Sequence, residues 1–164
     1  MIRQIIDNIN SKVDYSFKDV FYGVVYPIYN KDMYIPGSRS GEIYKDAVPD
    51  SSKKSIVYWE DWGTTTLEST KRWQSMQTEM RLIAWFNFSK IDKGYDECVN
   101  ELLSVVPRKE GKHTRLFLQG MLPKTEDIFA RYNYREGKQY MTAPFDVVAL
   151  RYQVRYMNLP YCPI

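Results

Sequence analysis

The sequence predicts a single α+β domain: a mainly antiparallel β-sheet with two amphipathic helices packed on one face, and long irregular loops. Three observations support this fold class. Several segments alternate apolar and polar residues with the period of a strand, only two long segments have helical spacing, and few crossover helices separate the strands. The length of 164 residues suits one domain, so residues 1–164 are assigned to it.

The two predicted helices lie at residues 2–12 and 94–106. In the first, isoleucines recur at positions 2, 5, 6 and 9 and form one apolar stripe. In the second, apolar residues follow the same rule, and Pro107 ends the helix. Asp96 and Glu97 fall in its first turn, where the helix dipole favours acidic side chains, and Asp92 is the expected N-cap.

Strands are predicted at residues 19–30, at two places within 55–70, at 74–91, at 113–122 and in the closing segment from residue 144. The two within 55–70 are expected to form a hairpin around a turn at 61–63. Pro27 fits only near the end of its strand or at a sheet edge. The clearest strand has an apolar face formed by Met80, Leu82, Ala84, Phe86 and Phe88. The closing strand has one face of Val148, Leu150, Tyr152, Val154 and Tyr156 and another of Ala149, Arg151, Gln153 and Arg155.

Two long connections and the end of the chain are predicted to contact other chains. Residues 31–55 carry repeated Pro, Gly and Ser turn signals around a short strand near 42–44, and residues 123–145 include a helical turn at 125–130. Loops of this length in a compact domain are usually functional or ordered by a partner. Residues 159–164 form an expected C-terminal arm, because Pro160 and Pro163 cannot donate hydrogen bonds in a ladder.

The composition argues against several protein classes. The net charge of +3 is too small to demand a nucleic-acid partner. Cys98 and Cys162 have neither zinc spacing nor a disulfide pattern, so both are expected to be reduced thiols. The first ten residues lack the apolar core of a signal peptide, and no apolar run approaches the roughly 20 residues of a membrane span.

Candidate catalytic residues are few, and the sequence predicts neither an enzyme nor a metal or cofactor site. The single histidine, His113, stands at the start of a strand, where a surface role is expected. Glu60 and Asp61 are adjacent on a strand and point to opposite faces, so a polar hairpin tip is expected there. Residues 111–114, GKHT, fail the phosphate-loop pattern because Val106 and His113 stand where glycine and serine or threonine are required. Residues 87–89 match a glycosylation acceptor but lie in an apolar strand.

Arginines on one sheet face are the most informative polar residues. Arg151 and Arg155 project with Gln153 from the polar side of the closing strand, and Arg81 and Arg115 join them if their strands are neighbours. One interpretation is an ordinary solvated face. The other is a basic channel lining or subunit interface that contacts phosphates or the carboxylates of a partner.

Aromatic residues provide a second set of interface candidates. The chain has 14 Tyr, 7 Phe and 4 Trp, and Tyr and Trp suit surfaces that are wet in one state and buried in another. The candidate interface aromatics are Tyr34, Tyr44, Trp59, Trp62, Tyr132, Tyr134 and Tyr140.

The pattern of elements resembles the tail-terminator and neck proteins of tailed bacteriophages. The resemblance rests on the opening helix, the long loop after the first strand, the strand MRLIAWFNF leading into the helix YDECVNELLSVV, and the closing strand FDVVALRYQVRYMNLPYC. It implies a virion structural protein, assembled in the bacterial cytoplasm, that forms a homo-oligomeric ring (a hexamer or a dodecamer) at the head-tail junction or tail end. Its partners would be copies of itself and other connector or tail proteins, without a membrane. The resemblance leaves open whether the arginines contact double-stranded DNA in the lumen.

Two other function classes stay open from the sequence, besides a host protein of unknown role. A small-ligand or carbohydrate-binding module could use Trp59, Trp62, Trp73 and Trp85 as stacking surfaces. An enzyme would need Glu60, Asp61 and His113 to meet in one cleft.

Overall fold

The structure is a computed structural model, and it describes residues 2–13, 20–30, 33–37, 51–61, 65–69, 74–110, 112–130 and 141–159. Along the chain the elements are α1 (Ile2–Lys12), β1 (Val20–Asn30), β2 (Met33–Gly37), β3 (Ser55–Asp61), β4 (Thr66–Ser69), β5 (Gln74–Asn87), α2 (Tyr95–Val105), β6 (Lys109–Glu110), β7 (Thr114–Leu122), α3 (Thr125–Phe129) and β8 (Phe145–Leu159). Side chains are described for a smaller set, which excludes those of β1 and β2.

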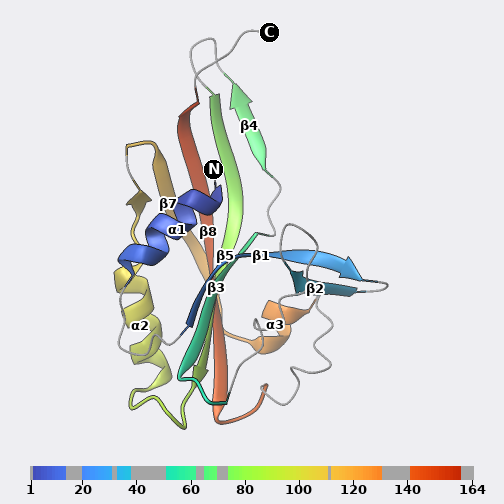
Figure 1. The fold of residues 1–164 in the computed structure, drawn as a ribbon, viewed down its shortest axis with the longest axis vertical. Coiled ribbons are helices and arrows are strands. Elements are labelled where there is room, and N and C mark those ends of the chain that lie inside the picture. The colour runs from blue at the N-terminus through green and yellow to red at the C-terminus, as the bar shows by residue number, and fades with distance from the viewer. Residues whose placement is uncertain are drawn as a thin grey trace.

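One sheet contains all the described strands, in the order β2-β1-β3-β5-β8-β7-β6, with β4 also paired to β5 (Figure 1). All of its neighbouring strands run antiparallel except β1 and β3. The predicted α+β fold with a mainly antiparallel sheet is therefore confirmed. The parallel pair was not predicted, because it joins strands separated by a long connection that leaves no local signal.

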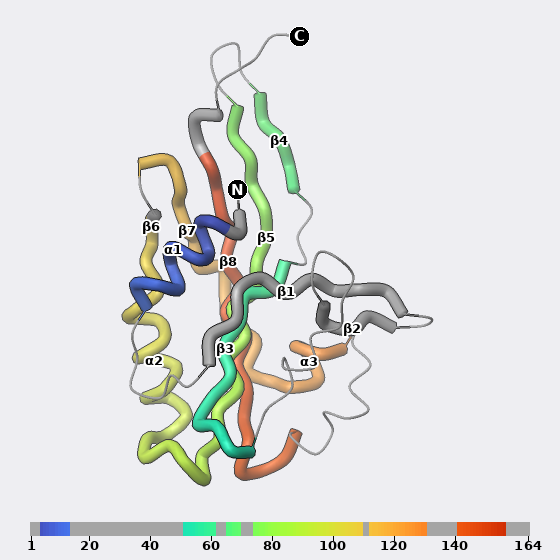
Figure 2. Tube along the Cα trace, in the orientation of Figure 1, coloured from blue at the N-terminus to red at the C-terminus, as the bar shows by residue number. Residues whose placement is uncertain are grey.

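The long strands β5 and β8 form the centre of the sheet, and they run side by side through most of its length (Figure 2). Because β8 pairs with β5 from Gln74 to Asn87, β3 and β4 must share the opposite edge of β5. They occupy successive stretches of that edge and do not pair with each other. The predicted hairpin around residues 61–63 is therefore wrong: β4 forms its hairpin with β5.

The main core lies between the sheet and the pair of helices α1 and α2, as predicted. Both helices contribute to a single apolar cluster, α1 through Ile6 and Ile9 and α2 through Cys98, Val99 and Leu102. Alternate residues of the strands face these helices: Val57 and Trp59 of β3, Met80, Leu82, Ala84 and Phe86 of β5, and Val148, Leu150, Tyr152, Val154 and Tyr156 of β8. The alternation predicted for the two long strands is thus confirmed, with Phe88 packed at the margin of the cluster.

A smaller apolar cluster lies on the opposite face, where α3 covers part of the sheet. Its members are Ile56, Tyr58, Ile83, Trp85, Ile128, Phe129, Val147 and Ala149. The rings of Trp85 and Phe129 stack with their centroids 5.1 Å apart. Further along β5 and β8 the residues of this face become polar, and α3 does not extend over them (Figure 1). This polar half of the face carries the candidate site.

Local details bear on three expectations. β2 lies inside the predicted loop 31–55 and forms an edge of the described sheet. The sequence did not predict this strand, because Pro36 and Gly37 are turn signals. Pro27 lies opposite Pro36 and beyond the last residue of β1 paired with β3, which agrees with its predicted place near a strand end. The N-cap of α2 is Gly94 and not Asp92, and the Gly94 backbone N–H donates to Glu97 Oε2 at 2.8 Å.

Other predicted features lie outside the described residues. These are the short strand at 42–44, most of the loop 31–55, residues 131–140 of the loop 123–145, and residues 160–164 of the arm, with Cys162 among them. In the part of the chain that is described, no helix is long and apolar enough to cross a membrane.

Candidate functional site: the arginine face of the sheet

Four arginines project from the same face of three neighbouring strands, which we call the arginine face. β8 lies between β5 and β7, so the strands that carry Arg81 and Arg115 are joined through β8 and are not direct neighbours. Arg151 of β8 lies directly opposite Arg81 of β5, and Arg155 of β8 lies directly opposite Arg115 of β7. The sequence predicted the shared face but not these two cross-strand pairs.

Arg81 is tied to buried partners. Its Nε donates to Glu60 Oε2 at 2.6 Å, and its Nη2 makes an ion pair with the same oxygen. Its Nη1 donates to the backbone oxygen of Ile128 at 3.1 Å, so one guanidinium joins β3, β5 and α3. The side chain of Arg81 is 15% exposed and that of Glu60 is 1% exposed. Arg81 is therefore mainly a structural clamp, which corrects the expectation that it lines an open channel surface.

The burial of Glu60 also corrects the predicted polar hairpin tip. Glu60 is the penultimate residue of β3 and pairs with Arg81 across the β3–β5 ladder. A carboxylate with so little exposure needs a cationic partner, because removing an isolated charge from water is very costly. The partner is 21 residues away in the sequence, beyond the range of any local pattern.

Within the described residues, the pair formed by Arg115 and Arg155 makes only neutral contacts. Arg155 Nη2 donates to Gln77 Oε1 at 3.0 Å, and the guanidinium carbon lies 5.8 Å from the centroid of the Phe117 ring. Arg115 Nη1 donates to the backbone oxygen of Thr114 at 3.1 Å. Both side chains are partly exposed, and each keeps N–H groups that these contacts do not use.

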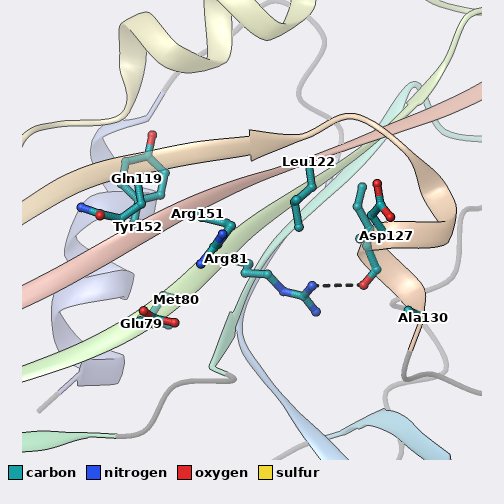
Figure 3. Close-up of a pocket in the computed structure, with 10 residues that line it drawn as sticks. Glu79, Met80, Arg81, Gln119, Leu122, Asp127, Ala130, Arg151 and Tyr152 are labelled. Atoms are coloured by element: carbon teal, nitrogen blue, oxygen red, sulfur yellow. Dashed lines mark hydrogen bonds between the residues drawn. The ribbon is translucent and has the colours of Figure 1, made fainter.

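Arg151 is exposed and borders a pocket of about 310 Å³ between α3 and the sheet (Figure 3). The pocket also has Glu79 and Asp127 in its lining, together with the apolar side chain of Leu122. Figure 3 shows Arg81 reaching across this region toward α3, where it makes its bond to Ile128. The pocket thus mixes both signs of charge and is not a deep acidic cavity.

Electrostatics distinguishes the outer arginines from Arg81. Like charges directly opposite each other across a ladder repel; Glu60 offsets the charge of Arg81, so the repulsion is strongest between Arg115 and Arg155. In the described part of the chain, Arg115, Arg151 and Arg155 form no ion pair that would relieve this repulsion. A row of guanidinium groups in this state can bind phosphate or carboxylate oxygens from another molecule.

The predicted interface aromatics have mixed outcomes. Trp59 is completely buried: its Nε1 donates to Asn10 Oδ1 at 3.2 Å and its ring lies 5.4 Å from that of Tyr152. The expectation that Trp59 contacts another chain is therefore wrong, because it packs against α1 in the core. The structure describes only the backbone of Tyr34, and the remaining candidates lie outside the described residues: Tyr44, Trp62, Tyr132, Tyr134 and Tyr140.

The residues considered for ligand binding and catalysis are only partly described. Trp85 is buried like Trp59, and Trp62 and Trp73 lie outside the described residues. His113 is exposed in the turn before β7, as predicted, whereas Glu60 is buried. Burial raises the pKa of the Cys98 thiol to about 11, so it is not an activated nucleophile. Among the described residues, no group of three or more His, Cys, Asp and Glu could hold a metal ion.

Asn87 illustrates why the glycosylation pattern at residues 87–89 is set aside. Its Nδ2 donates to the backbone oxygens of Ser51 at 3.2 Å and Lys53 at 3.1 Å. Its Oδ1 accepts from the backbone N–H of Ser89 at 3.2 Å and from Ser89 Oγ at 2.6 Å. The side chain is buried and holds the turn after β5 against the segment before β3.

Sequence reasoning missed one further surface, the outer edge of β7. Its exposed apolar residues are Phe117, Leu118 and Met121. The available signal was the uncharged run of residues 117–122, FLQGML, in a chain with 26% charged residues. No protein-family model matches the chain, and no curated protein is significantly similar to it. The functional argument therefore depends on the arrangement of these residues.

Proposed function

We propose that this chain is a structural protein of a tailed-bacteriophage virion, which forms a homo-oligomeric ring at the head-tail junction or tail end. The observation that carries the proposal is the arginine face, with two cross-strand arginine pairs on one side of the sheet. The pattern-level resemblance of the elements to tail-terminator and neck proteins supports the same assignment.

The physical argument begins with the repulsion between the paired arginines. Since Arg115, Arg151 and Arg155 form no ion pair within the described residues, their charges are available to anions from outside the subunit. Rotational symmetry repeats such a face once per subunit, so a ring repeats a small local charge as a series of positive patches around its wall. The net charge of only +3 agrees with a local basic surface and not with a general affinity for nucleic acid.

The proposed anions are phosphates of double-stranded DNA in the lumen or carboxylates of an adjoining subunit. Guanidinium groups bind both through paired N–H donors, so the chemistry of the site does not depend on which is present. The role needs no bond-making step: the arginines provide charge, and α1, α2 and α3 hold the sheet that presents them.

Native mass spectrometry and DNA binding test the two parts of the proposal. We expect the purified chain to form a closed oligomer at high concentration, and the oligomer to bind duplex DNA with a strong dependence on salt. Arg151→Gln should reduce the slope of log affinity against log salt by about 0.9 for each phosphate that the arginine neutralises. Lys90→Gln is the matched control, because it removes an exposed positive charge from the turn beyond the other end of β5.

The outcomes separate the ring from the DNA contact. A chain that stays monomeric at every concentration, alone and with DNA, would contradict the proposed ring. If the chain forms a closed oligomer but Arg151→Gln and Lys90→Gln show the same salt dependence of DNA affinity, the arginine face does not contact DNA. Its role would then be contact between subunits.

A further inference from the structure

The outer edge of β7 pairs with no described strand over most of its length. β7 pairs with β8 on one side from Thr114 to Leu122, but β6 covers only Thr114 and Arg115 on the other. Within the described residues, 117–122 therefore have no strand on their outer side. Edge strands are usually protected by charged residues or proline, because unpaired N–H and C=O groups attract another strand. Residues 117–122 contain neither.

Exposed apolar side chains are concentrated on this same edge. Four large apolar residues are exposed among those described, and three of them belong to this stretch: Phe117 at 43%, Leu118 at 49% and Met121 at 45%. The fourth, Leu67, is in β4. An apolar strip beside unsatisfied backbone groups is typical of a surface that another chain covers.

A bulge determines which way these side chains point. Leu118 is paired with Tyr152, Gly120 with Arg151 and Met121 with Leu150, so Gln119 is the extra residue. Tyr152 and Leu150 both face the helices α1 and α2, and their partners Leu118 and Met121 therefore lie on that face too. Phe117 and Leu122, paired with Gln153 and Ala149, lie on the arginine face. The spacing of three residues between Leu118 and Met121 would place them on opposite faces of a regular strand.

We propose that the edge of β7 binds the same edge of a second copy of this chain, antiparallel, about a two-fold axis between Gln119 and Gly120. In this register Leu118 lies opposite the partner's Met121, and Phe117 opposite the partner's Leu122. Each pairing occurs twice because of the two-fold axis, and each brings together side chains from the same face of the two sheets. This match depends on the bulge, which places Leu118 and Met121 on one face. Every opposed pair in the stretch is uncharged, so the strand is complementary to itself.

This contact is different in kind from the one that closes a ring. A ring forms through a head-to-tail contact between unlike surfaces, whereas a two-fold contact joins subunits in pairs. Combined with a hexameric ring it would give a double ring of twelve subunits, and alone it would give a dimer. The inference therefore goes beyond the proposed function, and neither requires the other.

Disulfide trapping between two variants, each with one introduced cysteine at the edge of β7, tests the register directly. Leu118→Cys and Met121→Cys are made separately in a Cys162→Ser background, in which the remaining Cys98 is buried. Directly opposed residues in an antiparallel pair have Cα atoms about 4.5–5.5 Å apart, which suits a disulfide. After mixing and mild oxidation we expect a cross-linked dimer that joins 118 to the partner's 121. Each variant alone should cross-link at least tenfold more slowly, because its cysteines lie three residues out of register.

A second measurement keeps the inference testable if cysteine changes the fold. Sedimentation velocity of the full chain should detect a dimer or a higher even oligomer, and Met121→Glu should weaken its association at least tenfold. Leu67→Glu is the matched control, because Leu67 is also an exposed apolar strand residue, and it should leave association unchanged.

Three results would overturn the inference: no faster cross-linking in the mixture than in the separate variants, a chain that is monomeric throughout, or equal weakening by the two glutamate variants. A closed ring without the 118–121 cross-link would reject this contact and leave the proposed function standing. A cross-linked dimer that never forms a ring would support the β7 contact and contradict the proposed function.

Discussion

Replacing Arg81 by methionine should destabilise the fold severely, because it leaves a buried carboxylate without its guanidinium partner. Glu60 is 1% exposed and contacts Arg81 through both Nε and Nη2, and the substitution also removes the donor to the Ile128 backbone oxygen. Removing one member of a buried ion pair typically costs about 3–5 kcal/mol of the free energy of unfolding. Methionine keeps most of the apolar length of the side chain, so little of the loss comes from a cavity.

Urea denaturation followed by circular dichroism and tryptophan fluorescence measures this loss, since urea does not screen the ion pair as guanidinium would. The double variant Glu60→Gln/Arg81→Met should be more stable than Arg81→Met alone, because it buries no unpaired charge. Arg151→Met is the matched control, because Arg151 lies opposite Arg81 across the ladder but is exposed. It should alter the free energy of unfolding by less than about 0.5 kcal/mol. A loss below about 1 kcal/mol for Arg81→Met would refute the assignment of this pair as a structural clamp.

Three further predictions concern the helix-bearing side and the end of β5. Asn87→Ala should cost about 2–3 kcal/mol of the free energy of unfolding in urea, because it removes all four hydrogen bonds of a buried amide, whereas the exposed Asn100→Ala should change little. Stability should fall as the pH rises from 9 toward 11, since the folded chain holds the Cys98 proton more tightly than the unfolded chain does, and Cys98→Ala should flatten that decline. A decline of equal steepness in both proteins would contradict the role of this thiol. Gly94→Ser should stabilise the chain by about 0.5–1 kcal/mol, because serine is a better N-cap and the φ of this residue is an ordinary negative one. The new Cβ has room, since the nearest atom, Glu97 Oε2, would be 3.6 Å away. A lower urea midpoint of unfolding for the variant would count against this description of the cap.

Features with a short repeat were predictable from the sequence. The alternation in β5 and β8 fixed which side chains face α1 and α2, because a strand presents every second residue to the same side. The same alternation placed Arg151 and Arg155 on the opposite face before any pairing was known. Helical spacing likewise identified α1 and α2, and the expectation that they share one face is confirmed.

Features that depend on distant pairing were not predictable. The hairpin expected around residues 61–63 relied on local turn signals, but β3 and β4 each pair with β5. The sequence neighbours of Glu60 suggested an exposed tip, whereas its environment is set by Arg81 on another strand. Trp59 was assigned to a surface on its residue type alone, although its position in β3 directs it into the core. The two arginine pairs depend on the register of β8 with β5 and β7, which no local signal determines.

A cryo-electron microscopy reconstruction of the assembled protein tests the central claim most directly. The account predicts a closed ring in which Arg151 and Arg155 of every subunit face the lumen or contact an adjoining subunit. A chain that forms no closed assembly, or an assembly that carries these arginines on its outer wall, would contradict it.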